Sequence, residues 1–333
     1  MRILVENSSW NNIGDGFYQF SLFNLLRKEF PHHDYAYLDA PASRSFRYAK
    51  PFSKNVFKFE EHQDADLYIF SGPILGSDFL AIYAPLIKQI QARGGNYALV
   101  SVHGDAESAN TILSFFSENP PLLLASRDRN TFDLYKNGKF PTYDGVCTAS
   151  LVSITCDVGD TTPDTRYIST SFYDGYEPHF EIKLNEQGSI SEISDISSWQ
   201  PEPNWKFKRH FEYLFKSYRS NIADFQIVRP VHDIGYKFSH LNYSRSNSFL
   251  SYNPLTYLSL YKGTSLTVTN RLHAALPTLS FGKPAAYVGS TRRNGAIDRL
   301  GLRNYQGRVV RLDREVLTSE YTSLVQAIRG IGL

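Results

Sequence analysis

The sequence has very little cysteine and no cluster of like charges, and each shortage excludes a class of protein. Its 333 residues contain two cysteines, Cys147 and Cys156, which support neither a zinc site of the CxxC type nor a disulfide framework. The lysines and arginines form no run, and the formal net charge is only +2. Nucleic-acid-binding proteins usually present a clustered basic face, so we expect no nucleic-acid partner.

Long apolar stretches are also missing from the sequence. No apolar run reaches the length of about 18 residues that a membrane-spanning helix needs. The opening segment, MRILVENSSW, lacks the apolar region of a secretory signal peptide. We therefore expect a soluble protein of the cytoplasm, and the sequence leaves attachment to a membrane surface open.

Aromatic residues, in contrast, are abundant. The chain contains 22 tyrosines and 23 phenylalanines, and aromatic residues make up 14% of it. Such a surplus lines carbohydrate-binding surfaces in some proteins and packs the hydrophobic core in others, and both interpretations stay open. The overall composition, 42% hydrophobic and 20% charged, is that of a globular protein.

The N-terminal segment has the pattern of a parallel α/β unit. Arg2 to Val5 form a short apolar run typical of a buried strand, and a polar loop with glycines follows it. From Phe17 to Phe30, apolar residues recur every three or four positions, which predicts one face of a helix. Asp15 lies where the N-cap of that helix is expected. Strand, turn and helix alternate again further along the chain, and this predicts an α/β fold with parallel sheets.

A stretch rich in turn residues interrupts this alternation near residues 155 to 165. We expect two Rossmann-like domains, covering residues 1–155 and 165–312, that face each other across a cleft. A terminal helix at 313–333 can pack back on the N-terminal domain. Ligands of such folds bind at the carboxyl ends of the parallel strands. One large sheet would produce the same alternation and is the alternative.

The segment VTNRLHAALPTLSFGKP, residues 268–284, contains the strongest chemical signal. Arg271 and His273 follow an apolar strand and begin a helix that Gly282 and Pro284 end. A helix N-terminus favours an anion, and an arginine adds a planar fork that binds carboxylate or phosphate. A histidine beside that anion can donate or accept a proton near neutral pH. In the alternative interpretation, Arg271 forms a structural salt bridge and His273 caps the backbone.

Four stretches together resemble the polysaccharide pyruvyl transferase family. The run TNRLHAALPTLSFGKPAAYVG, followed by Arg292 or Arg293 and by IDRLGL, is similar to the C-terminal signature of that family. NNIGD resembles the N-x-G-D turn of the family, and SGPILG resembles its glycine-rich turn. SRDRNTFDLY resembles its R-D segment, with Asp144 near the expected following aspartate. The four stretches have the expected order and spacing.

This resemblance implies a fold, a reaction and a set of partners. The fold would be similar to the GT-B architecture of two Rossmann-like domains that many glycosyltransferases share. The reaction would move the enolpyruvyl group of phosphoenolpyruvate onto a sugar as a pyruvate ketal and release phosphate. The acceptor would belong to a polysaccharide, such as an exopolysaccharide or capsule, or to its lipid-linked or nucleotide-linked precursor. No metal and no cofactor are implied.

The resemblance also implies a donor site around the R-L-H block. Phosphoenolpyruvate carries a carboxylate and a phosphate, so Arg271 and Arg127 would bind its anionic groups. His273 would transfer the proton that the methylene carbon receives. For Arg127, the alternative is a salt bridge with Asp128 at a helix start.

Other residues are assigned to the acceptor or to further donor contacts. Asp15 would hold an acceptor hydroxyl or act as a base, and its alternative is a plain N-cap. His103 would be a second acid–base group and His232 a substrate contact, although each is also readable as an ordinary loop histidine. The remaining predicted substrate contacts are Asn270, Arg292 and Arg293.

Two other functions are compatible with the same sequence. A nucleotide-sugar glycosyltransferase of the GT-B type would have the same architecture, but its second half would need a carboxylate for the ribose, and we find no strong glutamate candidate. A non-catalytic carbohydrate-binding relative would keep the fold and lose the reaction. The intact Arg271 and His273 pair argues against that loss.

Overall fold

The protein folds into two compact units. The computed structural model describes residues 1–7, 12–39, 59–159, 164–173, 176–196, 199–200, 218–233, 246–289, 291–302 and 304–333. The first unit contains Met1–Ser9, Tyr18–Thr148 and Thr318–Leu333, and the second contains Trp10–Phe17 and Ala149–Leu317. The change of unit at Thr148 comes a few residues before the break expected at 155 to 165. The short segment near the N-terminus that belongs to the second unit is a feature that the sequence pattern did not predict.

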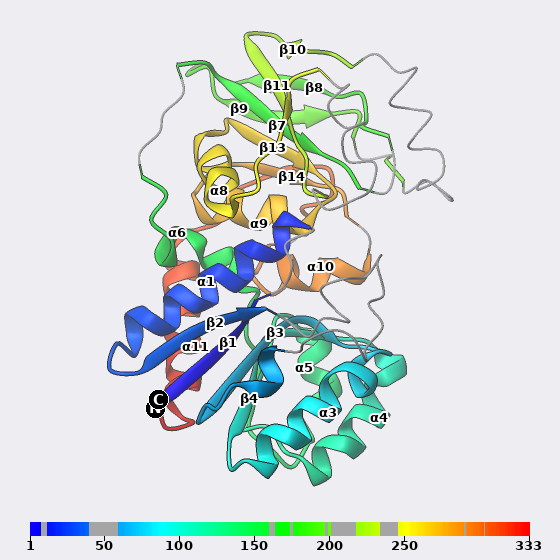
Figure 1. Ribbon diagram of the computed structural model, residues 1–333. Helices are drawn as coiled ribbons and strands as arrows, with labels where there is room; N and C mark the ends of the chain where they lie inside the picture. Colours follow the sequence, from blue (N-terminus) through cyan, green and yellow to red (C-terminus); the bar gives the residue numbers. More distant parts are fainter. Residues whose placement is uncertain are drawn as a thin grey trace. The chain divides into compact units, whose positions relative to one another are not determined.

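The first unit is built on a parallel sheet, whose strands β1, β2, β3 and β4 are labelled in Figure 1. Its described strands lie in the order β2 (Asp34–Asp39), β1 (Arg2–Asn7), β3 (Leu67–Leu75), β4 (Asn96–Gly104), β5 (Leu124–Ser126) and β6 (Thr142–Tyr143). Between the strands come α1 (Ile13–Glu29), the 3₁₀ turn η1 (Phe59–His62), α3 (Phe79–Ala92), α4 (Ala106–Glu118) and α5 (Arg129–Tyr135). The order reverses direction between β1 and β3, which is where doubly wound sheets commonly bind ligands.

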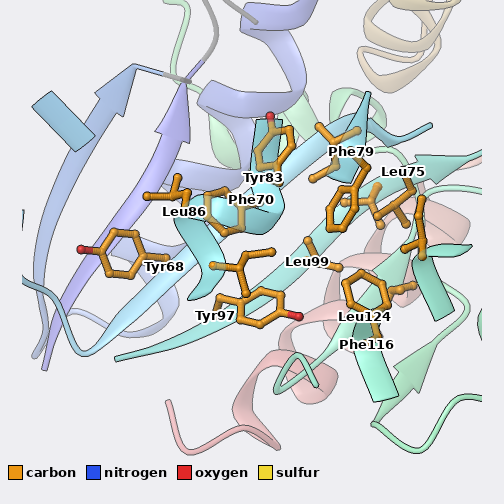
Figure 2. Packing of buried hydrophobic residues seen from close by; sticks show 14 of the residues in the cluster. Tyr68, Phe70, Leu75, Phe79, Tyr83, Leu86, Tyr97, Leu99, Phe116 and Leu124 are labelled. Carbon is orange, nitrogen blue, oxygen red and sulfur yellow. The ribbon is translucent and has the colours of Figure 1, made fainter. Parts of the chain in front are cut away.

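Aromatic side chains form much of the core of this unit. Figure 2 shows Phe70 and Tyr97 from β3 and β4 packed with Phe79 and Tyr83 of α3 and with Phe116 of α4. The ring of Phe79 stacks on that of Tyr83 with centroids 5.7 Å apart and meets the edge of Phe116 at 5.4 Å. Of the two interpretations of the aromatic surplus, core packing accounts for a large share, because the largest fully buried side chains are all tyrosine or phenylalanine.

The second unit contains a mixed sheet. Its described strands lie in the order β10 (Asn221–Ile222), β11 (Phe225–Pro230), β7 (Tyr167–Ser171), β13 (Leu266–Thr269), β14 (Ala285–Tyr287) and β15 (Val309–Val310), and β12 (Ser248–Phe249) pairs with β11. The central pairs are parallel, whereas β10 and β15 run antiparallel at the ends. A separate hairpin joins β8 (Glu181–Leu184) and β9 (Ile190–Ser194). The helical elements among its described residues include η2 (Thr148–Leu151), α6 (Val152–Thr155), α8 (Pro254–Gly263), α9 (Leu272–Ser280) and α10 (Thr291–Asp298).

A buried ion pair stabilises the middle of the second unit. Arg229 of β11 donates from Nε and Nη2 to the two carboxylate oxygens of Glu177, at 2.8 and 2.7 Å, and its side chain is only 2% exposed. Two backbone carbonyls, those of Ser246 and Arg219, accept further bonds from the same guanidinium at 2.8 Å. Because every arm of Arg229 is engaged, this arginine is structural.

The last helix, α11 (Arg314–Arg329), belongs from Thr318 onward to the first unit. There Leu324 and Ile328 are buried, and the hydroxyl of Tyr321 donates to Glu29 of α1 at 2.5 Å.

The start of α1 differs from the prediction. The helix begins at Ile13, so Asp15 lies in its first turn and is not the N-cap. Asn12 caps the helix instead, because its side-chain oxygen accepts the amide of Gly14 at 3.2 Å and its carbonyl accepts the amide of Asp15 at 2.9 Å.

Candidate active site

Arg271 lies at the junction of β13 and α9, as the sequence predicts. It occupies the N-cap position of α9, and one residue, Asn270, separates it from the end of the central strand β13. The hydroxyl of Thr269 accepts the backbone amide of Arg271 at 2.9 Å and donates to the carbonyl of Ser171 at 2.5 Å. The side chain of Asn270 accepts the amide of Tyr173 at 2.7 Å. These bonds fix the backbone of the turn that presents Arg271.

The guanidinium of Arg271 is buried but only partly engaged. Its Nη2 donates to Asp233 at 2.6 Å, and its carbon lies 4.9 Å from the centre of the Tyr173 ring. Its Nε is buried and has no hydrogen-bond partner in the described part of the chain. Burial alone would lower the pKa of Arg271, but Asp233 more than offsets this and the pKa is raised. Arg271 is thus a permanent cation that keeps donor capacity for an anionic ligand.

His273 and Asp15 lie beside this arginine. The Nδ1 atom of His273 is 3.9 Å from a carboxylate oxygen of Asp15, and the two side chains are 12% and 17% exposed. The distance exceeds that of a direct hydrogen bond. The structure therefore brings together Asp15 and His273, two residues that the sequence predicts as catalytic and that lie far apart in the sequence.

The absence of a side chain at Gly14 allows the start of α1 to pack closely against His273. A Cβ atom on Gly14 would lie 2.8 Å from Cβ of His273 and 3.2 Å from Nδ1 of His232. The amide of Ile13 donates to the carbonyl of His232 at 2.8 Å, and Asn12 bridges to Asp233. The N-x-G-D turn and the R-L-H block are thus packed directly against each other, inside the second unit.

His232 itself lies in an aromatic core. Only 1% of it is exposed, its Nε2 is 2.6 Å from the hydroxyl of Tyr261, and its ring packs edge-on against Phe17. Burial, helped by the charge of Arg271, holds the pKa of His232 well below its usual value. The prediction that His232 contacts substrate is not supported by this burial, which is typical of a structural residue placed behind the site.

We expect the stability of the protein to fall between pH 6.5 and pH 5 because of His232. The folded state keeps this ring neutral, whereas the unfolded chain binds a proton below about pH 6.5. Each pH unit below that value therefore costs about 1.4 kcal/mol until the folded-state group also titrates. Chemical denaturation at a series of pH values should show this slope, and His232→Gln should reduce it. An identical slope in that variant, or its loss on replacing the exposed His179, would contradict the assignment.

The first unit places His103 and Arg127 at neighbouring strand ends. His103 is the penultimate residue of β4, and Arg127 directly follows β5. The Nδ1 atom of His103 is 2.8 Å from Oδ2 of Asp128, and that same oxygen is 3.9 Å from Nε of Arg127. Burial alone would raise the pKa of Asp128, but His103, the amide of Thr131 and Arg127 hold it below its usual value. Asp128 is therefore a carboxylate at neutral pH.

Arg127 is buried, at 6% exposure, and its Nε has no hydrogen-bond partner among the described residues. Asp128 does not engage it closely, because that carboxylate accepts from His103 and from the N-terminal turn of α5. Asp144, near the aspartate position of the family, is 3.0 Å from Nη1 of Arg129. The predicted substrate contacts Arg292 and Arg293 fall in the first turn of α10, and their side chains lie outside the described part.

Several residues at these sites were not predicted from the sequence. Asp233 and Tyr173 hold Arg271, and Asp128 holds His103. Glu6, at the end of β1, is 5% exposed and accepts from the hydroxyl of Tyr83 at 2.5 Å and from the amide of Ser71 at 3.2 Å. A carboxylate at the end of a predicted strand was the available signal for Glu6, whereas the others depend on contacts between distant segments.

The described residues contain neither a membrane-spanning helix nor a metal-binding cluster. No helix among them is long and apolar enough to cross a membrane. Within the same residues, histidine, cysteine, aspartate and glutamate side chains form no group of three or more that could hold a metal ion.

Solved structures with a similar fold identify the fold type of this chain. A putative UDP-N-acetylglucosamine 2-epimerase from Listeria monocytogenes is similar with a TM-score of 0.52 and 11% sequence identity, over 99% of this chain and 89% of that chain. MnaA from S. aureus, in its structure with UDP, is similar with a TM-score of 0.51 and 12% identity, over 98% of this chain and 90% of that chain. At these identities the likeness shows the fold alone, and it confirms the predicted GT-B type of α/β fold.

A family model identifies the chain more specifically. No curated protein matches the sequence at a significant level. The model described as polysaccharide pyruvyl transferase matches residues 12–292, which begin at the cap of α1 and include the R-L-H block. The family resemblance seen in the sequence is thereby confirmed: the chain belongs to the polysaccharide pyruvyl transferase family and is a transferase.

Proposed function

We propose that the protein transfers the enolpyruvyl group of phosphoenolpyruvate to a sugar of a polysaccharide or of its lipid-linked or nucleotide-linked precursor. The observation that supports this most strongly is the position of Arg271 beside His273 and Asp15. Arg271 keeps an unpartnered, buried Nε within the described residues, and it stands at the N-terminus of α9. A cation with spare donor capacity at a helix N-terminus suits a ligand that carries a carboxylate and a phosphate.

The reaction takes two protons from sugar hydroxyls and adds two, one to the methylene carbon of the donor and one to the departing phosphate. A proton joins the methylene carbon of phosphoenolpyruvate, which becomes a methyl group, and the oxygen of a first sugar hydroxyl bonds to the central carbon. The oxygen of a second hydroxyl then bonds to the same carbon, and phosphate leaves with the electron pair of its C–O bond. The two protons lost by the hydroxyls balance the proton gained by the methyl group and the proton taken up as phosphate departs.

His273 is the acid in this proposal. It lies in the first turn of α9, two residues after Arg271. Asp15 lies 3.9 Å from Nδ1 of this ring. Asp15 as the group that holds an acceptor hydroxyl stays a prediction, as does Arg127 as a second donor-binding cation.

Replacing His273 by glutamine should separate binding from chemistry. We expect the affinity for phosphoenolpyruvate to change little, because Arg271 and the helix N-terminus remain, while kcat falls by about 10²- to 10⁴-fold with loss of the acid. Calorimetry would measure donor binding, and phosphate release with a panel of sugar acceptors would measure turnover. In D₂O the ketal methyl group should gain one deuterium, as read by mass spectrometry.

The matched control is His179→Gln, since His179 is an exposed histidine of the same unit. This variant should keep wild-type turnover. Wild-type turnover in His273→Gln would remove His273 from the reaction. Binding of a nucleotide sugar, without any binding of phosphoenolpyruvate, would instead favour the glycosyltransferase alternative.

A further inference from the structure

His103 and Asp128 form a closely fitted pair in the first unit. The ring nitrogen Nδ1 of His103 is 2.8 Å from Oδ2 of Asp128, and Asp128 is almost completely buried, with 4% of its side chain exposed. The other oxygen of Asp128 caps α5 by accepting the amide of Thr131 at 2.9 Å. Since both oxygens have fixed partners, the carboxylate cannot rotate without breaking the helix cap.

This arrangement determines which nitrogen of His103 bears the proton. Asp128 is ionised at neutral pH, and a carboxylate oxygen only accepts hydrogen bonds. If Nδ1 were unprotonated, its lone pair would face that oxygen at 2.8 Å, so the neutral ring must carry its proton on Nδ1. Nε2 is then the acceptor nitrogen. The side chain of His103 is 26% exposed, and its Nε2 has no hydrogen-bond partner among the described residues.

We propose that Asp128 is a positioning residue that fixes the Nδ1–H tautomer of His103, so that Nε2 accepts the proton of a sugar hydroxyl at the carboxyl end of β4. The inference rests on the proposed function, which requires removal of such a proton. As the hydroxyl oxygen forms its new bond to carbon, the O–H electron pair stays with oxygen and the proton passes to Nε2. Buried aspartates orient histidine bases in hydrolases by the same physical means.

Asp128→Asn is a direct test of this inference, because the helix cap at Thr131 determines the orientation of the asparagine side-chain amide. The amide oxygen has to face the Thr131 N–H, since an NH₂ group there would oppose another donor. The NH₂ group is then left facing Nδ1 of His103, and it can only donate to it. The variant therefore keeps the helix cap, for which asparagine is well suited, and favours the proton on Nε2. The hydroxyl of Thr131, 3.3 Å from Nδ1 of His103, can also donate to Nδ1 in that form.

The tautomer can be read directly by nitrogen-15 NMR of the imidazole rings, with His103→Gln to assign the signals. We expect the Nδ1–H form in the wild-type protein and the Nε2–H form in Asp128→Asn. With phosphoenolpyruvate and a panel of sugar acceptors, kcat measured by phosphate release should fall by about 10²-fold or more, while KM for phosphoenolpyruvate changes little. If Asp128 had only a structural role, Asp128→Asn would leave the tautomer of His103 unchanged.

The chain offers a matched control in Asp105, which caps the neighbouring helix α4 through the amide of Ser108 at 2.8 Å and has no histidine partner among the described residues. Asp105→Asn should keep both kcat and the His103 signals. An Nε2–H tautomer in the wild type, or unchanged kcat in Asp128→Asn, would overturn the inference. A wild-type protein that neither binds phosphoenolpyruvate nor releases phosphate would overturn the proposed function, while the NMR signals would still decide whether Asp128 orients His103.

Discussion

Replacing Arg271 by alanine is expected to abolish the thermal stabilisation of the protein by millimolar phosphoenolpyruvate. A ligand at about 100 times its dissociation constant stabilises a protein by about 2.7 kcal/mol, which shifts a melting curve clearly. Loss of a charged hydrogen bond costs about 1.5 to 3 kcal/mol, or roughly 10- to 150-fold in affinity. Because Arg271 is buried and still has an unpartnered Nε among the described residues, we place the expected loss at the upper end.

The unliganded stability must be measured beside this shift, since Arg271 also neutralises Asp233. Alanine at position 271 leaves that carboxylate, 19% exposed, without its 2.6 Å partner, and we expect a lower melting temperature even before ligand is added. Arg271→Lys keeps the charge but lacks the planar fork, so it should restore part of the unliganded stability and little of the ligand shift.

Arg166→Ala is the matched control for this experiment. Arg166, in the same unit, also pairs with a carboxylate, that of Asp224 at 2.8 Å, and lies over an aromatic ring, that of Phe225 at 4.1 Å. Its side chain is 47% exposed, so it is a surface version of the same arrangement. The control should retain the full shift with phosphoenolpyruvate. A full shift in Arg271→Ala would show that the donor binds elsewhere.

Replacing Gly14 by alanine is expected to reduce kcat by about 10²-fold through its effect on His273. The added Cβ would lie 2.8 Å from Cβ of His273, a distance that real Cβ contacts essentially never reach. The atom in its way belongs to the first turn of α9, so the start of that helix or of α1 has to move. A displacement of about 1 Å at a catalytic group is enough to cost this much in rate.

Phosphate release and calorimetric binding of phosphoenolpyruvate would separate this effect from general unfolding. We expect weaker catalysis in Gly14→Ala with a folded protein, as judged by circular dichroism. Gly76→Ala is the control, since the only atom of the described residues that its Cβ would meet within 4 Å is a carboxylate oxygen at the flexible end of Asp105. Equal activity of the Gly14 and Gly76 variants would show that the close packing of Gly14 on His273 has no catalytic consequence.

The sequence by itself determined the α/β fold class and the local setting of the R-L-H block. Apolar runs and three-to-four spacings are local properties, so they predict strands such as β1 and helices such as α1 without knowledge of the rest of the chain. The same local logic places Arg271 and His273 at a strand end and helix start, because Gly282, with a φ of 70°, marks where that helix must stop.

Only the tertiary structure decided which residues surround these groups. Asp233 reaches Arg271 across 38 positions of sequence, and Asp128 reaches His103 across 25, and no periodicity encodes such pairings. Burial also depends on tertiary packing, which leaves only 1% of His232, a predicted substrate contact, exposed. Hydrogen-bond partners and burial are decided when distant elements pack together and remove apolar surface from water. Periodicity indicates only which face of a single element becomes buried.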